Sequence, residues 1–185
     1  MKDKLIFGSH GRDVYIFPGV RILRPQFISI GDHGGIGKHA DIFARPGHSR
    51  PKEYLLKICN NVPIGSYNII GARKSVVLEE NALLGLRVIT LDYTHQYENV
   101  EVPIKDQEVT EGSIRIERDC WIGANVFILP NVTIGQHAMV GVNSVVDRDI
   151  PSYTLAAGAP ARVIKLYDFD LKKWGRVDEE GSLLE

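Results

Sequence analysis

The stretch that decides the fold runs from Cys120 to Val146 and reads CWIGANVFILPNVTIGQHAMVGVNSVV. An aliphatic residue returns in it every six positions, at Ile122, Ile128, Ile134, Val140 and Val146. An amphipathic helix needs apolar residues three and four positions apart, and a half-buried strand alternates strictly, so neither pattern fits. A fixed short period indicates a repeat architecture, and a period of six is typical of a parallel β-helix.

A second register supports this prediction. Four positions after each aliphatic residue stands a small or medium one: Cys120, Val126, Val132, Ala138, Ser144 and Ile150. We expect the aliphatic residue to point inward and the smaller one to fill a corner, while Gly, Asn and Asp occupy the turns. Three such sides make one triangular coil, and several coils must stack before any of them is stable.

The same period extends over most of the chain. It appears at Ile30, Ile36 and Ile42, resumes at Ile58, Ile64 and Ile70, and continues after a two-residue slip at Leu78, Leu84 and Thr90. Two polar or proline-containing segments break it, so we expect loops at about 43–57 and 96–115. The prediction is an all-β protein with a β-helix domain over 1–165 and a tail over 166–185, in which LYDFDLKKWGR forms a short helix.

Composition limits the classes of function. The chain has 185 residues and a formal net charge of −1, which offers no electrostatic attraction to nucleic acid or to an anionic membrane. No apolar run approaches the roughly 18 residues needed to cross a bilayer, and the first residues lack a signal-peptide core. We therefore expect a soluble, cytoplasmic protein. The two cysteines, Cys59 and Cys120, make no disulfide framework and are expected to be reduced and buried.

The C-terminal half resembles a known family. THQY, VPIKDQ, GSIRIERDCWIGANVFILPNVTIGQHAMVGVNSVV and DIPSYTLAAGAPARVIK follow one another as they do in the hexapeptide-repeat acyltransferases, most closely in the sugar and polysaccharide O-acetyltransferase branch. The resemblance implies a left-handed β-helix, a homotrimer with active sites between subunits, and acetyl transfer from acetyl-CoA to a hydroxyl of a sugar or polysaccharide precursor. The handedness rests on the resemblance alone.

The resemblance also implies a catalytic base. His95, in LDYTHQY, occupies the place of a loop histidine that takes the proton from the acceptor hydroxyl, which then attacks the thioester directly, without an acyl-enzyme. The unperturbed pKa of histidine is about 6.5, close to working pH. Relatives often carry a second histidine two positions earlier, where this chain has Tyr93. Asp92 is a candidate to orient His95, although a backbone carbonyl would serve as well.

Further binding residues follow from the family pattern. Small turn residues would hold the pantetheine arm through their backbone groups, and basic residues near the last coils would contact the phosphates. The expected cofactor-binding residues are Ala124, Val142, Arg148, Arg162 and Lys165. The expected acceptor-binding residues are Trp121, Tyr97, Gln107 and Asp92.

The remaining histidines and cysteines are expected to have no catalytic duty. His33, His39 and His137 fall at turn corners, and His48 lies in the first loop, where a surface role is favoured. Cys120 stands at an inward position, where burial raises a thiol pKa and makes it unreactive. Only His95 lies where a cleft ligand should be, so no metal is expected.

Other functions remain open at this point. An N-acetyltransferase acting on an amino sugar or a nucleotide-linked amino sugar would use the same base and co-substrate. A γ-type carbonic anhydrase shares the trimeric β-helix but needs three histidine ligands for zinc. A non-catalytic scaffold would keep the coils and lose the site, which the joint presence of His95, PIKDQ and AGAPARVIK argues against.

Overall fold

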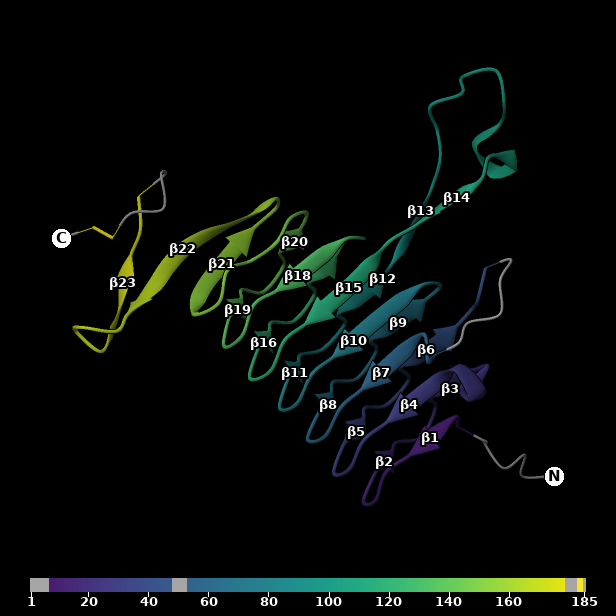
Figure 1. Cartoon of the computed structure of the whole chain (residues 1–185), viewed down its shortest axis with the longest axis horizontal. Helices are drawn as coiled ribbons and strands as arrows, with labels where there is room; N and C mark the ends of the chain where they lie inside the picture. Colours follow the sequence, from purple (N-terminus) through teal and green to yellow (C-terminus); the bar gives the residue numbers. More distant parts are fainter. Residues whose placement is uncertain (1–6, 48–52, 179–182, 185) are drawn as a thin grey trace.

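The computed structural model describes residues 7–47, 53–178 and 183–184 and shows a three-sided parallel β-helix (Figure 1). Each coil contributes one short strand to each of three parallel sheets. The first sheet contains β1 (Ser9–His10), β4 (Ile28–Ile30), β7 (Leu56–Ile58), β10 (Ser75–Leu78), β15 (Ser113–Ile116) and β18 (Val132–Ile134). The coils stack along the long axis from the N-terminal to the C-terminal end, as expected for a left-handed β-helix of hexapeptide repeats.

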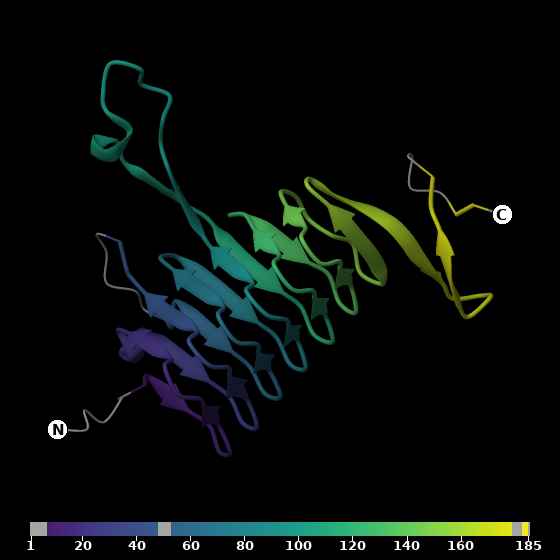
Figure 2. The same ribbon diagram turned by 180° about the vertical axis from the view of Figure 1, so that it is seen from behind.

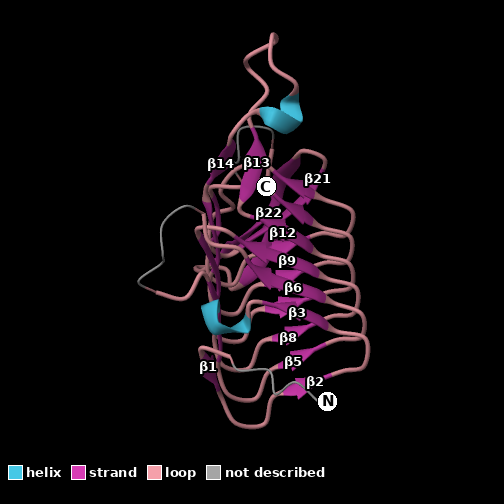
Figure 3. Ribbon diagram, turned by 90° about the vertical axis from the view of Figure 1, so that its right-hand side faces the viewer, coloured by secondary structure: helices cyan, strands magenta, loops and turns pink. Residues whose placement is uncertain are grey.

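The other two sheets complete the triangle. The second begins with β2 (Tyr15–Ile16), β5 (Gly35–Ile36), β8 (Pro63–Ile64), β11 (Leu83–Leu84), β16 (Trp121–Ile122), β19 (Met139–Val140) and β21 (Thr154–Gly158). The third contains β3 (Arg21–Leu23), β6 (Asp41–Ala44), β9 (Ile69–Ala72), β12 (Ile89–Leu91), β17 (Phe127–Ile128) and β20 (Val145–Val146). Viewed from the side, the strands and their turns form regular ladders (Figure 3).

The core is a set of aliphatic columns, as the period of six predicts. In the third sheet Ile42, Ile70, Thr90, Ile128 and Val146 lie in one register, and each is fully buried. Similar columns line the other two sheets. Burying each aliphatic side chain contributes about 1.5–3 kcal/mol, and only the stack of coils provides that burial.

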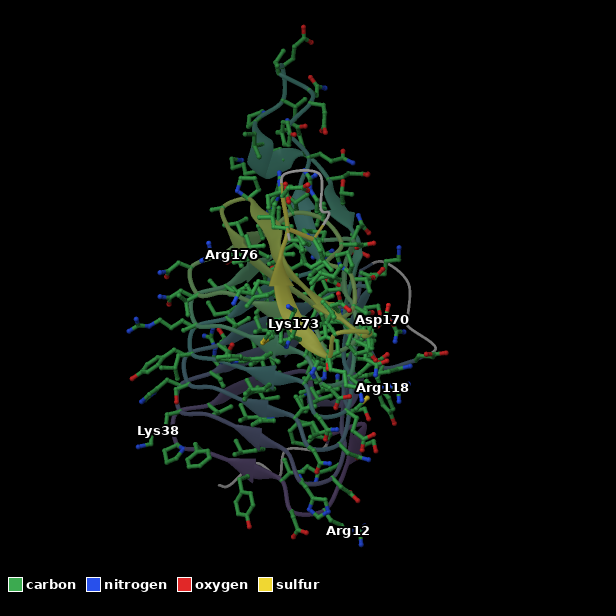
Figure 4. The ribbon with its side chains drawn as sticks, turned by 90° about the vertical axis from the view of Figure 1, so that its left-hand side faces the viewer. Arg12, Lys38, Arg118, Asp170, Lys173 and Arg176 are labelled. Carbon is green, nitrogen blue, oxygen red and sulfur yellow. The ribbon has the colours of Figure 1, made fainter. Side chains whose placement is uncertain are left out.

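The corners carry residues with left-handed backbone angles. His33, His39 and His137 each have φ of 57°, and Asn125 and Asn143 occupy equivalent corners with φ of 57° and 59°. The prediction that the three histidines sit at exposed corners is confirmed. Charged side chains lie on the outer surface of the coils, among them Arg12, Lys38 and Arg118 (Figure 4).

The β-helix begins earlier than the clear repeat does. β1, β2 and β3 form a complete first coil, in which His10 pairs in register with Ile30 and Ile16 with Ile36. His10 therefore stands at an inward register position at the end of the stack, where no earlier coil is present among the described residues, and it is exposed. The 20-residue spacing from His10 to Ile30 hides this coil from a search for an 18-residue repeat.

The two predicted loops leave the β-helix at the same corner, between the third and the first sheet. The first lies between β6 and β7, and its residues 48–52, including His48, lie outside the described residues. The second is an antiparallel hairpin of β13 (Tyr93–His95) and β14 (Val109–Glu111), with a 3-10 turn η2 (Ile104–Asp106) near its tip. It projects far from the stack (Figures 1 and 2). The hairpin begins with β13 at Tyr93, and the chain rejoins the first sheet at Ser113. The excursion therefore lies a few residues earlier than the predicted 96–115.

The predicted C-terminal helix is wrong. Residues 161–176 form β22 (Ala161–Asp168) and β23 (Lys173–Arg176), which extend the second sheet in antiparallel fashion. Tyr167 and Trp174 lie directly opposite each other, and their rings pack edge to face with centroids 5.5 Å apart. The described helical segments are η2 and the 3-10 turn η1 (Pro25–Phe27), drawn in cyan in Figure 3. In the described part of the chain, no helix has the length and apolar character that crossing a bilayer requires.

Candidate active site

The hairpin that carries His95 is anchored at its base by a buried carboxylate. Asp92 is fully buried and accepts hydrogen bonds of 2.8 Å from the backbone N–H groups of Arg73, Lys74 and Ser75. These three residues form the corner where the sequence slips by two positions. Burial raises the pKa of Asp92 above its usual value, while the three amide donors act in the opposite direction.

This arrangement corrects two expectations about Asp92. Its carboxylate is engaged by the corner amides, and the structure places no hydrogen bond between it and His95. Because the side chain is fully buried, it does not reach an acceptor either. Asp92 therefore fixes the corner from which the hairpin departs.

His95 lies at the outer end of β13. It pairs in register with Val109, and Tyr93 pairs with Glu111. Residues two apart on a strand share a face, as do residues directly opposite on an antiparallel pair, so all four side chains belong to one face of the hairpin. His95 is exposed, while the other three are partly buried. The imidazole is thus presented to solvent by a rigid two-stranded support.

The outer part of the loop is held by Gln107. Its Nε2 donates to the carbonyl oxygens of Asn99 and Val102 at 2.8 Å each, and its Oε1 accepts from the Asn99 N–H at 3.3 Å. The side-chain amide of Gln107 is therefore occupied within the loop, and its predicted role in acceptor binding stays a prediction. Tyr97 is 65% exposed, and its ring is available for a contact.

Trp121 lies away from the hairpin, on the outer face of the second sheet. It pairs in register with Leu83 and Met139, and Met139 pairs with Leu155. Trp121 is 52% exposed and Leu83 is 42% exposed. These outward residues form an apolar column that one chain leaves uncovered. Lys165 of β22 pairs with Leu155 of β21, so Lys165 stands at the next position of this column.

Ala124 and Val142 meet at the corner between the second and the third sheet. They belong to successive coils, and the Asn143 N–H donates to the Ala124 carbonyl oxygen at 2.9 Å. Among the described residues, neither the Ala124 N–H nor the Val142 N–H donates a hydrogen bond. The corner thus presents two free amide donors about 4.8 Å apart, the spacing of neighbouring strands. Such donors suit the amide groups of a pantetheine arm.

Two of the predicted basic residues gather around one carboxylate. Arg148 Nε lies 3.3 Å and Arg162 Nη1 lies 3.2 Å from the same Asp147 oxygen. Partial burial of Asp147 works against its charge, but the two guanidinium groups outweigh this effect and lower its pKa. Both arginines remain half exposed, so the cluster carries a net positive charge that can contact phosphate.

Cys120 is buried, as expected, whereas Cys59 is only partly buried. Burial raises the pKa of Cys120 to about 12, and its Sγ lies 3.0 Å from the Gly135 carbonyl oxygen. Burial also raises the pKa of Cys59, with Glu79 and Glu80 acting in the same direction. Within the described residues, no three His, Cys, Asp or Glu side chains gather as metal ligands.

The predicted site residues therefore fall into separate groups on one chain. His95 and Tyr97 lie on the hairpin, Ala124 and Val142 at a different corner, and Trp121 on the outer face of the second sheet. Sequence reasoning missed Arg73 and Glu111, which form an ion pair at the base of the hairpin. The only sequence signal for Arg73 was its place in the slip after Ile70.

The comparisons with known proteins agree with this fold. Residues 113–148 match the family model of the bacterial transferase hexapeptide (six repeats). The match covers β15 to β20, the part with the cleanest period. Over these residues the chain is similar to the hexapeptide-repeat transferases.

Two curated relatives of this hexapeptide-repeat protein share much of its length. It is 29% identical to "Probable acetyltransferase Rv3034c" of Mycobacterium tuberculosis, over 87% of this chain and 50% of that protein. It is also 29% identical to "Putative lipopolysaccharide biosynthesis O-acetyl transferase WbbJ" of Escherichia coli K12, over 76% of this chain and 71% of the relative. The chain therefore spans about half the length of the mycobacterial relative.

A solved structure shows the same fold. A variant of AntD, an N-acyltransferase from Bacillus cereus, superposes with a TM-score of 0.75 and 23% identity, covering 89% of this chain and 87% of AntD. That structure holds dTDP-4-amino-4,6-dideoxyglucose and coenzyme A. At 23% identity this similarity supports the left-handed β-helix fold and does not extend to activity or substrate.

Proposed function

We propose that this hexapeptide-repeat protein transfers an acetyl group from acetyl-CoA to a hydroxyl of a sugar or polysaccharide precursor. The observation that carries the proposal is the placement of His95. Its imidazole stands exposed on a hairpin that three buried amide-to-carboxylate hydrogen bonds anchor to the β-helix. The acetyltransferase relatives support the choice of donor.

The transfer follows from what His95 can do. Its neutral imidazole takes the proton of the acceptor hydroxyl while the hydroxyl oxygen bonds to the acetyl carbonyl carbon. The carbon–sulfur bond then breaks, and His95 returns the proton to the departing thiolate. Acetyl-CoA supplies the activated acyl group for this step. A well-placed general base contributes about 10²–10⁴ in rate.

The residues present fit the co-substrate. The free N–H groups of Ala124 and Val142 would hold the amide arm, and Arg148 and Arg162 would contact the phosphates. Both thiols are protonated near neutral pH because burial raises their pKa values, which supports direct transfer over an acyl-enzyme.

The separation of these groups on one chain supports a homotrimer with sites between subunits. His95 and the Ala124–Val142 corner lie at different corners of the triangle, so a neighbouring copy would bring the two together. The exposed apolar column of Leu83 and Trp121 offers a surface for such packing.

A second candidate is N-acetylation of an amino sugar. The carboxylate of Glu111 lies on the same face of the hairpin as His95. It favours this candidate because a carboxylate forms a charge-assisted hydrogen bond with the ammonium group of an amino sugar. The base and the co-substrate would be the same.

The test is thiol release from acetyl-CoA by wild type and His95→Ala with a panel of hexoses, disaccharides and amino sugars. We expect acceptor-dependent release that falls by about 10²–10⁴ in the variant. His33→Ala, which removes an exposed corner histidine, is the matched control and should keep full activity. Equal turnover by wild type and His95→Ala would refute the assignment of the base.

A further inference from the structure

An ion pair that the proposed mechanism does not use lies below His95. Arg73 Nε donates to Glu111 Oε1 at 2.8 Å, and the Arg73 guanidinium stacks over the Tyr93 ring at 5.5 Å. The two charged side chains are only 25% and 28% exposed. They line a hollow together with Gln107, Glu108 and Val109.

Two residues that line this hollow, Val109 and Glu111, share a face of the hairpin with His95. Tyr93 and His95 share a face of β13, and Glu111 and Val109 stand directly opposite them on β14. Tyr93 and His95 are roughly 7 Å apart along the strand, and Glu111 lies directly opposite Tyr93. A sugar seated on Glu111 would therefore present a hydroxyl to His95.

The Glu111 carboxylate keeps one oxygen free for a ligand. Oε1 accepts from Arg73, while Oε2 accepts no hydrogen bond from any described side chain or backbone group. The first loop approaches here through Gly47, where an added Cβ would lie 2.8 Å from Glu111 Oε1. Because Gly47 has no side chain, its backbone lies close to the carboxylate without a Cβ against it.

The charges of the lining select among acceptors. Among the described residues of the lining, one cation, Arg73, stands against two carboxylates, Glu108 and Glu111, so these residues carry a net negative charge. Hydroxyl and ammonium groups donate hydrogen bonds to a carboxylate, whereas an acidic sugar brings a second carboxylate into the same space.

We propose that Glu111, held by Arg73, binds the acceptor in this hollow and orients it under His95, and that the site selects neutral or amino sugars over acidic ones. The inference rests on the proposed acetyl transfer and adds the acceptor class. Glu111 is a substrate-binding residue in this account, and Arg73 is a positioning residue.

The experiment compares glucose, glucosamine and glucuronate, which share one ring and differ in charge. Binding to wild type, Glu111→Gln and the exposed control Glu101→Gln is measured by saturation-transfer NMR without acetyl-CoA. Acceptor KM and acetyl-CoA KM are measured separately, and thermal unfolding checks that each variant is folded. Wild type should bind glucosamine and glucose and reject glucuronate.

Removing the charge should weaken the acceptor alone. A hydrogen bond to a charged group contributes about 1.5–3 kcal/mol, so Glu111→Gln should raise the acceptor Kd and KM by roughly 10- to 100-fold. The acetyl-CoA KM should stay unchanged, discrimination against glucuronate should shrink, and Glu101→Gln should behave as wild type.

A second variant leaves the ion pair's own residues intact. Gly47→Ala places a methyl group against the carboxylate and should raise the acceptor KM even if Glu111→Gln folds poorly. Unchanged affinity and ranking in both variants would overturn the inference, as would wild type that binds none of the three sugars. Sugar binding through Glu111 without thioester cleavage would leave the site standing and refute the proposed function. Loss of turnover in His95→Ala with unchanged sugar binding in Glu111→Gln would support the proposed function and refute the role of Glu111.

Discussion

Thr90 interrupts an aliphatic column of the core. It lies in register between Ile70 and Ile128, it is fully buried, and its Oγ1 finds no hydrogen-bond partner. An unsatisfied buried hydroxyl costs about 1–3 kcal/mol. We expect Thr90→Val, which keeps the shape and removes the hydroxyl, to raise the free energy of unfolding by about 1 kcal/mol or more.

Urea denaturation of the purified protein measures this change. Thr94→Val is the control, because Thr94 is exposed on β13, and it should shift the free energy of unfolding by less than about 0.5 kcal/mol. A Thr90→Val protein less stable than wild type would mean that the hydroxyl has a partner in solution.

Individual site residues were harder to predict than the fold. The sequence predicts Asp92 and Gln107 in the site because they neighbour His95 along the chain or match the family's loop. Asp92 instead binds amides 17–19 positions earlier, and Gln107 binds its own loop. These contacts depend on how coils stack and how a loop folds back, and a one-dimensional pattern does not record them. The corner histidines were predictable because a six-residue register fixes the position of each turn.

At the scale of one coil, stacking leaves no room at certain turn positions. A Cβ added to Gly65 would lie 2.3 Å from the Gly85 carbonyl oxygen of the next coil, whereas one added to Gly35 would meet no atom closer than 3.9 Å. We expect Gly65→Ala to force the two coils apart and cost about 1–3 kcal/mol. Gly35→Ala should change stability by less than about 0.5 kcal/mol.

Chemical denaturation of both variants tests this contrast, because they make the same substitution at two glycines without left-handed backbone angles. Equal stability of Gly65→Ala and Gly35→Ala would show that the coils tolerate a methyl group between them.

Elements that follow the period were predictable, and the C-terminal element was not. LYDFDLKKWGR has too few residues to separate a helical from a strand pattern. Its strands are fixed by pairing with β21 and by the contact of Tyr167 with Trp174. A local signal was present, since the Asp168 side chain accepts from the N–H groups of Asp170 and Leu171 and so closes a turn between the two aromatic residues.

At the scale of the whole molecule, the proposed function predicts an assembly of several copies of the chain. His95 and Val142 lie at different corners of one β-helix, so a site that uses both would take them from two subunits. The assembly should then have three times the chain mass of 20.6 kDa in sedimentation equilibrium.

Mixed assemblies separate a shared site from a site within one chain. His95→Ala lacks the base, and Val142→Trp, at a residue 62% exposed, blocks the corner proposed to hold the co-substrate. Each variant alone should be inactive. When the two are unfolded together and refolded at equal amounts, random assembly gives about a quarter of the sites both an intact His95 and an intact corner. Thiol release from acetyl-CoA should therefore recover to about a quarter of the wild-type value. A mixture as inactive as its components would place both groups of a site on one chain and contradict the shared site.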